Sequence, residues 1–268
     1  MEPISSFQNI LIKQVQKLEK NRERRKQNMA LVEGIRECQL AIVAGHTVQK
    51  LLFCSAYISE IELRAKLGAM PDTPLIDVSP QVFDSMVYRK GVANVLGIIH
   101  PNNCHFEAID VSKKLLLLII DSVEKPGNLG AMLRTCDAAG VDAIVVCDPQ
   151  TDIYNPNCIR ASLGAVFTKK IIVTNAEECI TWLGANNIST FVTYLDSATP
   201  YTSQNYTSSS AIVVGSEANG IKECWLKNKF QNIIIPQYGQ VDSMNVANSA
   251  AIIIYEALRQ RTYKPVIS

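Results

Sequence analysis

The sequence lacks a long apolar run and a leader-like N-terminus, and each absence excludes a class of protein. Its longest aliphatic stretch is Leu115–Ile120, far short of the roughly 18 apolar residues that a membrane helix needs. The first twelve residues contain no Lys or Arg, and no apolar segment follows them. We therefore expect no membrane span, no secretory or mitochondrial leader, and a cytoplasmic location.

Closely spaced metal ligands are also missing. None of the eight cysteines forms a CxxC pair, and the three histidines add no metal-ligand spacing, so we expect scattered buried thiols and no metal site. What is present is typical of a folded, soluble protein: 268 residues, of which 47% are hydrophobic and 19% are charged. That length suits one large domain or two smaller ones.

Charge is balanced overall but uneven along the chain. The net charge of +1 does not indicate a strongly basic nucleic-acid binder, yet Lys13–Lys26 holds seven basic residues against two acidic ones. Because Lys17, Lys20 and Arg24 recur at helical spacing, the run taken alone predicts a solvated helix face.

The two halves of the chain differ in pattern. Before residue 100, a helical stretch (Leu31–Ala44) mixes with short strand-like runs such as Lys50–Cys54 and Val95–Ile99. Pro101 and the polar residues up to Lys114 interrupt this pattern, which predicts a linker. The two predicted domains are residues 1–105 and 114–268.

Beyond the linker, apolar β-rich runs alternate with segments of helical potential. This pattern predicts an α/β domain with a mostly parallel sheet that helices cover on both faces. In such sheets the ligand lies outside the carboxyl ends of the strands, so the residues after each strand are the candidates for a site. The runs are 115–120, 142–147, 170–173, 190–195, 211–214 and 232–235.

The first post-strand segment predicts a helix over Leu129–Ala139, with Asn128 as its N-cap and Gly140 as its stop. Arg134 falls off the apolar stripe of this helix, in the second turn and near the carboxyl edge of the sheet. Taken alone, Asn128 needs no role beyond capping this helix, and a surface salt bridge would explain Arg134.

The second segment, Gly215–Gly220, follows the strand at 211–214. Its glycines allow the backbone to approach a ligand closely, although turn glycines alone would look the same. No GxGxxG motif follows any strand, and Gly220 is followed by Ile221-Lys222 and not by Lys-Ser/Thr. A dinucleotide-binding fold and a Walker ATPase are therefore not supported.

The third segment leads into the last helix. Asp242, Ser243 and Asn245 stand at its entrance, where they would either grip a polar cofactor tail or cap the helix. Residues 246–254 are small and apolar almost all round, so we expect this helix to be buried against the sheet or a second subunit.

Together these segments resemble the SpoU (TrmH-like) branch of the SPOUT RNA methyltransferases, the trefoil-knotted ribose 2′-O-methylases. Asn128-x-Gly130-x3-Arg134 looks like the first family motif, and Gly215-Ser216-Glu217 like the second. The third is similar to Ile235-Pro236 with Asp242–Ala247. The middle segment Tyr154–Pro156 with Arg160–Ser162 is similar too. Residues Phe7–Ile99, with Leu31-Val32-Glu33-Gly34, resemble the small ribosomal-protein-like α/β substrate-binding domain often found in this family.

The resemblance implies S-adenosylmethionine as cofactor, a trefoil knot in the C-terminal half, and a homodimer. It implies backbone contacts to the cofactor at Leu195, Gly215, Ile235 and Met244. It assigns catalysis to the positions of Arg134, Glu217, Ser243 and Asn245, and the sequence departs from the usual pattern at Ala218 and Met244.

The implied activity is RNA 2′-O-ribose methylation, with ribosomal RNA as the favoured substrate. Alternatives are a tRNA methylase and a non-catalytic RNA-binding or ribosome-assembly protein. No histidine lies near a motif, and the guanidinium of Arg134, which the family account makes the base, stays protonated in water. We expect Arg134 to hold the target phosphate and hydroxyl, and to act as a base only when activated.

The other polar residues receive supporting roles. Glu217 and Asn245 would orient Arg134 or the amino-acid tail of the cofactor, and Ser243 would hold the hydroxyl or that tail. An RNA substrate also favours phosphate contacts from the basic run. The predicted substrate-binding residues are Asn128, Arg22, Arg24, Arg25 and Lys26.

Overall fold

The computed structural model describes residues 2–68, 73–88, 93–240 and 243–261. The chain forms two compact units: residues 1–102 together with 152–168, and residues 103–151 together with 169–268. In the described residues, no helix is both long and apolar enough to cross a membrane.

The first unit is built on a four-stranded sheet in the order β1-β4-β2-β3. β4 runs antiparallel to both of its neighbours, and β2 and β3 are parallel. The strands are β1 (Ala30–Glu33), β2 (Thr47–Phe53), β3 (Leu75–Asp77) and β4 (Val95–His100). The helices are α1 (Ile10–Leu18), α2 (Asn21–Gln27), α3 (Ile35–Val43), α4 (Glu60–Leu67), α5 (Pro80–Asp84), α7 (Pro156–Ala161) and α8 (Ala165–Thr168).

The expected helical stretch Leu31–Ala44 is in fact a strand followed by a helix. Residues 30–33 pair with β4 as β1, and α3 begins only at Ile35. Gly34 makes the break, because its φ of 107° lies in the left-handed region that side chains rarely adopt. A Cβ at this position would also run into the carboxylate of Glu37.

The basic run differs from expectation as well, since it forms two short helices. Arg24 on α2 is 3% exposed, and its Nε donates to Asp152 Oδ2 at 2.6 Å. Its Nη1 donates to the carbonyls of Leu18 and Glu19, which satisfies acceptors that the end of α1 leaves open. Arg24 is therefore not part of a solvated face, and we remove it from the predicted RNA contacts. The other three predicted RNA contacts on this run, Arg22, Arg25 and Lys26, are exposed.

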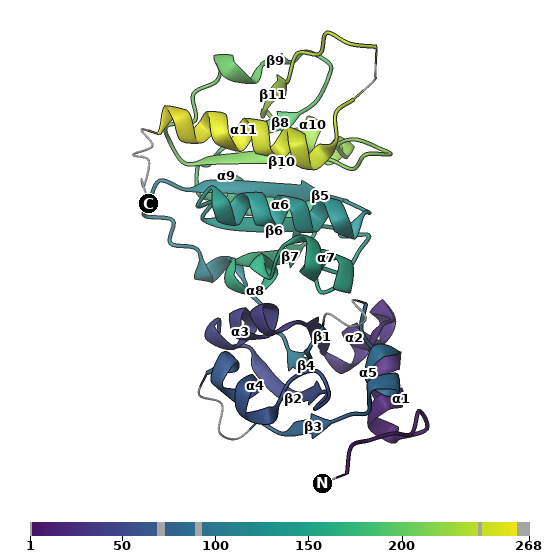
Figure 1. Ribbon diagram of the computed structural model, residues 1–268. Coiled ribbons are helices and arrows are strands. Elements are labelled where there is room, and N and C mark those ends of the chain that lie inside the picture. The colour runs from purple at the N-terminus through teal and green to yellow at the C-terminus, as the bar shows by residue number, and fades with distance from the viewer. Residues whose placement is uncertain (1, 69–72, 89–92, 241–242, 262–268) are drawn as a thin grey trace. The chain divides into compact units, whose positions relative to one another are not determined.

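The second unit carries a seven-stranded sheet in the order β7-β6-β5-β10-β8-β11-β9, and all its pairings are parallel (Figure 1). The sequence predicted six of these strands, and only the two-residue β9 was missed. The strands are β5 (Leu116–Asp121), β6 (Ala143–Cys147), β7 (Ile171–Thr174), β8 (Ser189–Thr193), β9 (Thr199–Pro200), β10 (Ser210–Val214) and β11 (Gln231–Ile234).

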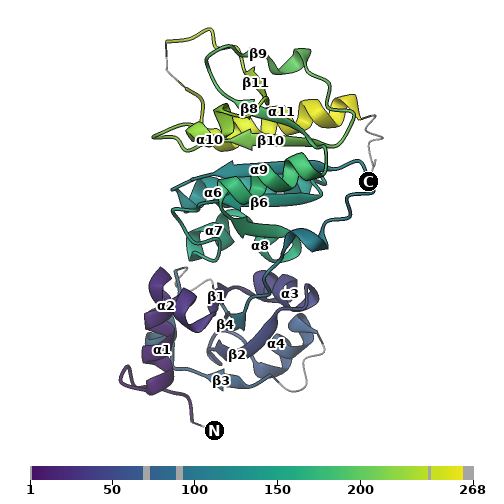
Figure 2. The same ribbon diagram turned by 180° about the vertical axis from the view of Figure 1, so that it is seen from behind.

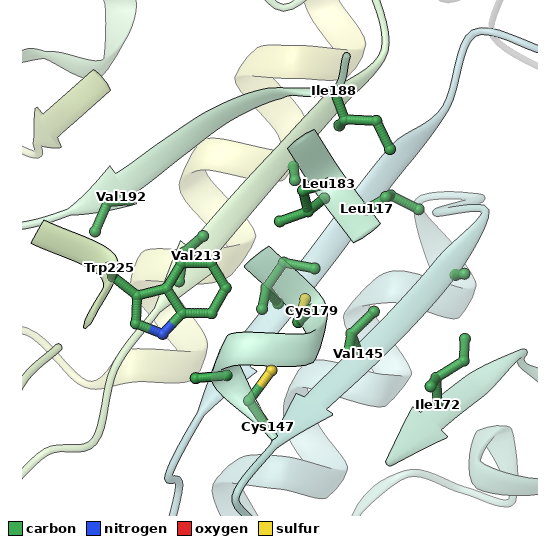
Figure 3. Packing of buried hydrophobic residues seen from close by; sticks show 14 of the residues in the cluster. Leu117, Val145, Cys147, Ile172, Cys179, Leu183, Ile188, Val192, Val213 and Trp225 are labelled. Atoms are coloured by element: carbon green, nitrogen blue, oxygen red, sulfur yellow. The ribbon is translucent and has the colours of Figure 1, made fainter. Parts of the chain in front are cut away.

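Helices cover both faces of this sheet. α6 (Pro126–Ala138) and α11 (Val246–Gln260) pack together on one face (Figure 1). α9 (Ala176–Ala185) and α10 (Glu223–Leu226) lie on the other, which Figure 2 shows from behind. Under α9 and α10 the core includes the buried indole of Trp225 together with Val192, Val213 and Leu183 (Figure 3). Strands buried on both faces explain why the apolar runs were nearly continuous.

Two helix predictions need correction. α6 begins at Pro126 and not at Leu129, because proline suits the first helical position and Lys125 takes the N-cap place. Asn128 is thus the third residue of the helix, not its cap. α11 is not buried all round: it packs on α6 and β10, but Tyr255 is half exposed.

Candidate cofactor and catalytic site

A cavity of about 330 Å³ opens at the carboxyl ends of β8, β10 and β11, next to the start of α11. It lies where the sequence predicted a ligand site, because parallel strands end at the same edge of a sheet. The four residues predicted to contact the cofactor all line it: Leu195, Gly215, Ile235 and Met244.

The backbone around this cavity contains N–H groups that have no hydrogen-bond partner in the part of the chain that the structure describes. The N–H groups of Leu195, Gly215 and Ile235 follow the last residues of their strands, and none has an acceptor among the described residues. Buried backbone donors normally have partners, and Gly215 is buried. Its backbone also runs so close to that of Gly220 that a Cβ would lie 2.3 Å from the Gly220 carbonyl oxygen. Glycine is therefore required at this position.

These features fit S-adenosylmethionine. The cavity walls are largely aliphatic, with Ile221, Ile233 and Val246 beside the four residues named above, which suits a purine ring. The unpaired N–H groups suit the polar edge of an adenine, and Glu217, Ser243 and Ser249 also line the cavity. Apolar walls with a few placed polar groups are typical of a small-molecule site.

A polar bridge joins the three sequence motifs at the edge of this cavity. Asn128 Nδ2 donates to Glu217 Oε1, and Asn128 Oδ1 accepts from Asn245 Nδ2 at 3.2 Å. Asn245 also caps α11, because its Oδ1 accepts the N–H groups of residues 247 and 248. One asparagine from α6 thus links the loop after β10 to the start of α11.

Lys125 is a site residue that sequence reasoning missed. Its ammonium group lies 3.0 Å from Glu217 Oε2, and its side chain is largely exposed. It stands at the N-terminus of α6, where the helix dipole adds to its positive charge. The signal available in the sequence was Pro126, which marks the true start of the helix.

The structure does not bring every predicted residue to the cavity. Ser243 lines it, whereas Asp242 lies outside the described residues. Arg134 is exposed in the third turn of α6 and does not line the cavity. Its side chain has no hydrogen-bond or ion-pair partner among the described residues, so a surface salt bridge does not account for it. Nor do these residues contain a cluster of three or more His, Cys, Asp or Glu able to hold a metal.

The second unit is thus an open parallel α/β sheet with a cofactor-sized cavity at its carboxyl edge, which places it among the α/β proteins that bind a ligand at the ends of their strands. Residues 115–255 match the SpoU rRNA Methylase family, and residues 9–97 match the MRM3-like substrate binding domain. The chain belongs to the SpoU rRNA methylase family. This confirms the family that the sequence motifs indicated. It also confirms the expectation of a methyltransferase that uses S-adenosylmethionine.

Relatives share almost the whole chain. The 23S rRNA (guanosine(2553)-2′-O)-methyltransferase RlmP of Bacillus subtilis is 30% identical, over 95% of this chain and 98% of its own. The SpoU methyltransferase AviRb of Streptomyces viridochromogenes, solved with S-adenosylmethionine, superposes with a TM-score of 0.84 at 26% identity, covering 94% of this chain and 99% of its own. An S-adenosylmethionine-bound rRNA methyltransferase from Sinorhizobium meliloti gives 0.86 at 25% identity, covering 96% and 97%.

Proposed function

We propose that this protein methylates a ribose 2′-hydroxyl of ribosomal RNA with S-adenosylmethionine. The observation that carries the proposal is the cavity at the carboxyl ends of β8, β10 and β11, where parts of the second and third motifs meet. RlmP and the 23S rRNA (uridine(2479)-2′-O)-methyltransferase of Streptomyces viridochromogenes, 26% identical over 94% of this chain, support ribosomal RNA over tRNA.

S-adenosylmethionine, when bound, supplies the methyl group. The backbone groups of Leu195, Gly215 and Ile235 would hold its adenine end, and Met244 would close the apolar wall. The task left to the polar side chains is to place a ribose hydroxyl in line with that methyl group, because in-line displacement depends on geometry.

Glu217 is well placed for this orienting role. Asn128 and Lys125 hold its two carboxylate oxygens, and Asn245 braces Asn128 in turn. Ser243 would donate to the hydroxyl or to the carboxylate tail of the cofactor. With its polar groups fixed before substrate arrives, the site needs little reorganisation during the reaction.

Arg134 would bind the target nucleotide. Its exposed guanidinium, without a protein partner among the described residues, can take a phosphate oxygen and the hydroxyl together in its planar fork. Removal of the hydroxyl proton would follow only once that contact has formed. Asn128 would help to bind the same nucleotide from the start of α6.

The first 105 residues would bind substrate RNA, and residues 114–268 would form the methyltransferase domain, apart from residues 152–168, which belong to the first compact unit. The match of residues 9–97 to a substrate binding domain supports this division. Phosphate contacts would come from three exposed residues of the basic run, Arg22, Arg25 and Lys26. Such contacts position RNA without reading its sequence.

The proposal includes a trefoil knot, a homodimer and a cytoplasmic location. The strand order supports the knot, because the chain returns to the middle of the sheet with β10 after it has formed β8. Large exposed apolar side chains at Leu195, Tyr238 and Tyr255 support a partner subunit on this unit. Sedimentation should show a dimer at micromolar concentration, and a monomer would contradict this part.

The test is transfer of a labelled methyl group from S-adenosylmethionine to RNA, followed by mapping of 2′-O-methyl sites. RNA from a strain that lacks the gene is the substrate, separated into ribosomal RNA and tRNA. We expect label in ribosomal RNA at one mapped ribose. Label in tRNA alone would overturn the substrate assignment. Cofactor binding without transfer to any RNA would make the protein a non-catalytic RNA binder.

A further inference from the structure

A buried carboxylate that the proposed chemistry does not use lies at the end of β5, the strand beside β10, whose own end lines the cofactor cavity. Asp121 is the last residue of β5 and is fully buried. Its Oδ2 accepts the backbone N–H of Lys222 at 3.1 Å, and its Oδ1 accepts from the hydroxyl of Ser122. Burial raises the pKa of Asp121, although the Lys222 N–H and ammonium group oppose this. A buried charge of this kind is costly unless it is well paired.

The pairing comes from the same lysine. The ammonium group of Lys222 lies 2.7 Å from Asp148 Oδ2 and 3.8 Å from Asp121 Oδ1. Asp148 follows β6 and also accepts the first N–H of α9, that of Ala176. Lys222 therefore ties the end of its own loop to the carboxyl ends of two neighbouring strands.

The segment that Lys222 ends is the cavity loop, residues 215–222. Ser216 and Gly220 exchange two backbone hydrogen bonds, which close the loop on itself. The Ser216 hydroxyl accepts the N–H of Asn219. The loop begins after β10 and leads into α10, whose third residue is the buried Trp225 (Figure 3). Between these two fixed points, Lys222 contacts Asp121 and Asp148 at the far end of the loop.

We propose that Asp121 and Lys222 are positioning residues for the cofactor cavity, holding the cavity loop in the conformation that lines it. The inference rests on the proposed cofactor site. Gly215, Glu217 and Ile221 all line the cavity, so a loop released at Lys222 presents these groups in several conformations. Cofactor affinity then falls by the fraction of molecules in the competent one.

Two variants of Lys222 test this in the full-length protein. Lys222→Met removes the ammonium group and keeps the backbone N–H, whereas Lys222→Arg keeps the positive charge. Calorimetry gives the Kd for S-adenosylmethionine and for its product, S-adenosylhomocysteine. Hydrogen exchange of residues 215–222 in the ligand-free protein reports the loop itself. We expect Lys222→Met to weaken both ligands at least about fivefold, as coupled sites typically do, and to speed exchange. Lys222→Arg should recover most of the affinity.

The chain offers a control contact at the other end of β5, made by Asp142, an exposed residue just before β6. Asp142 Oδ2 accepts the N–H of Leu116 at 2.7 Å, which is the same kind of contact at the opposite end of β5. Asp142→Asn should lower the melting temperature yet leave the Kd and the exchange of the cavity loop unchanged, whereas Asp121→Asn should follow Lys222→Met.

Two results would overturn the inference. One is a Lys222→Met protein with wild-type Kd values and wild-type exchange. The other is loss of affinity in Asp142→Asn equal to that in Lys222→Met, which would reduce the effect to general stability. A wild-type protein that binds neither ligand would refute the proposed function instead, and exchange alone would then decide whether Lys222 holds the loop.

Discussion

Replacing Arg24 tests whether the basic run contains a residue that stabilises the fold beside the exposed residues proposed to bind RNA. Arg24 is buried and ion-paired, whereas its neighbour Arg25 is exposed. We therefore expect Arg24→Met to destabilise the first unit and Arg25→Met to leave its stability unchanged. Both residues are arginines next to each other on α2, and they differ in burial and in the contacts that burial brings.

The expected magnitude follows from what Arg24→Met leaves behind. The side chain of Asp152, 10% exposed, would keep a charge without its partner. The carbonyls of Leu18 and Glu19 would lose a donor each. Breaking a buried pair in this way typically costs about 3–5 kcal/mol, whereas an exposed substitution stays within about 0.5 kcal/mol. Adding Asp152→Asn to Arg24→Met removes the stranded charge and should recover part of the loss.

The assay must report the first unit. Both tryptophans, Trp182 and Trp225, belong to the second unit, so their fluorescence does not follow the first unit directly. Urea unfolding by circular dichroism, with hydrogen exchange of residues 10–28, reports it instead. A loss below about 1 kcal/mol for Arg24→Met would refute the argument from burial. An equal loss for Arg25→Met would refute it too.

Three further predictions concern activity, RNA binding and pH. Arg134→Ala should lower methylation about 100-fold or more, the usual cost of a lost transition-state contact, with the Kd for S-adenosylmethionine within twofold; wild-type turnover would remove Arg134 from the site. Combined replacement of Arg22, Arg25 and Lys26 by Gln should weaken RNA binding and flatten its log–log salt slope by up to about 2–3; an unchanged slope would make the run a bland exposed surface. Burial lowers the pKa of His46, whose ring accepts one backbone N–H and donates to one carbonyl. The unfolded chain therefore binds a proton first, so urea titrations should show stability falling as the pH drops below about 6.5, and His46→Gln should flatten that dependence.

The parallel sheet was predictable because its strands are buried on both faces. Each apolar run in the second half needed only its length and composition to be read as a strand. The same reading failed at Leu31–Ala44, where the apolar spacing suits a helix and a strand equally. Pairing with β4 decided the outcome there, and a partner 60 or more residues away leaves no trace in local spacing.

A buried charge was the second feature that the sequence could not predict. Lys17, Lys20 and Arg24 share a helical spacing, and nothing in that spacing marks one of them as buried. The partner of Arg24 is Asp152, 128 residues away in the chain. Such a pair becomes visible only when the fold brings its members together, which is why the sequence placed Arg24 among the RNA contacts.

Asn128 shows why motif residues can be found before their roles are. Taken as a single residue before an apolar stripe, Asn128 predicts a helix cap, because asparagine is strongly preferred at that position. Pro126 takes the first place in the helix and moves Asn128 one turn inward, so its amide is free to reach sideways. There it donates to Glu217 and accepts from Asn245, two residues that lie 89 and 117 positions further along the chain. An amide can donate and accept at once, which a carboxylate or an ammonium group in its place could not do. The three motifs therefore act as one site because a single side chain satisfies opposite demands from the other two.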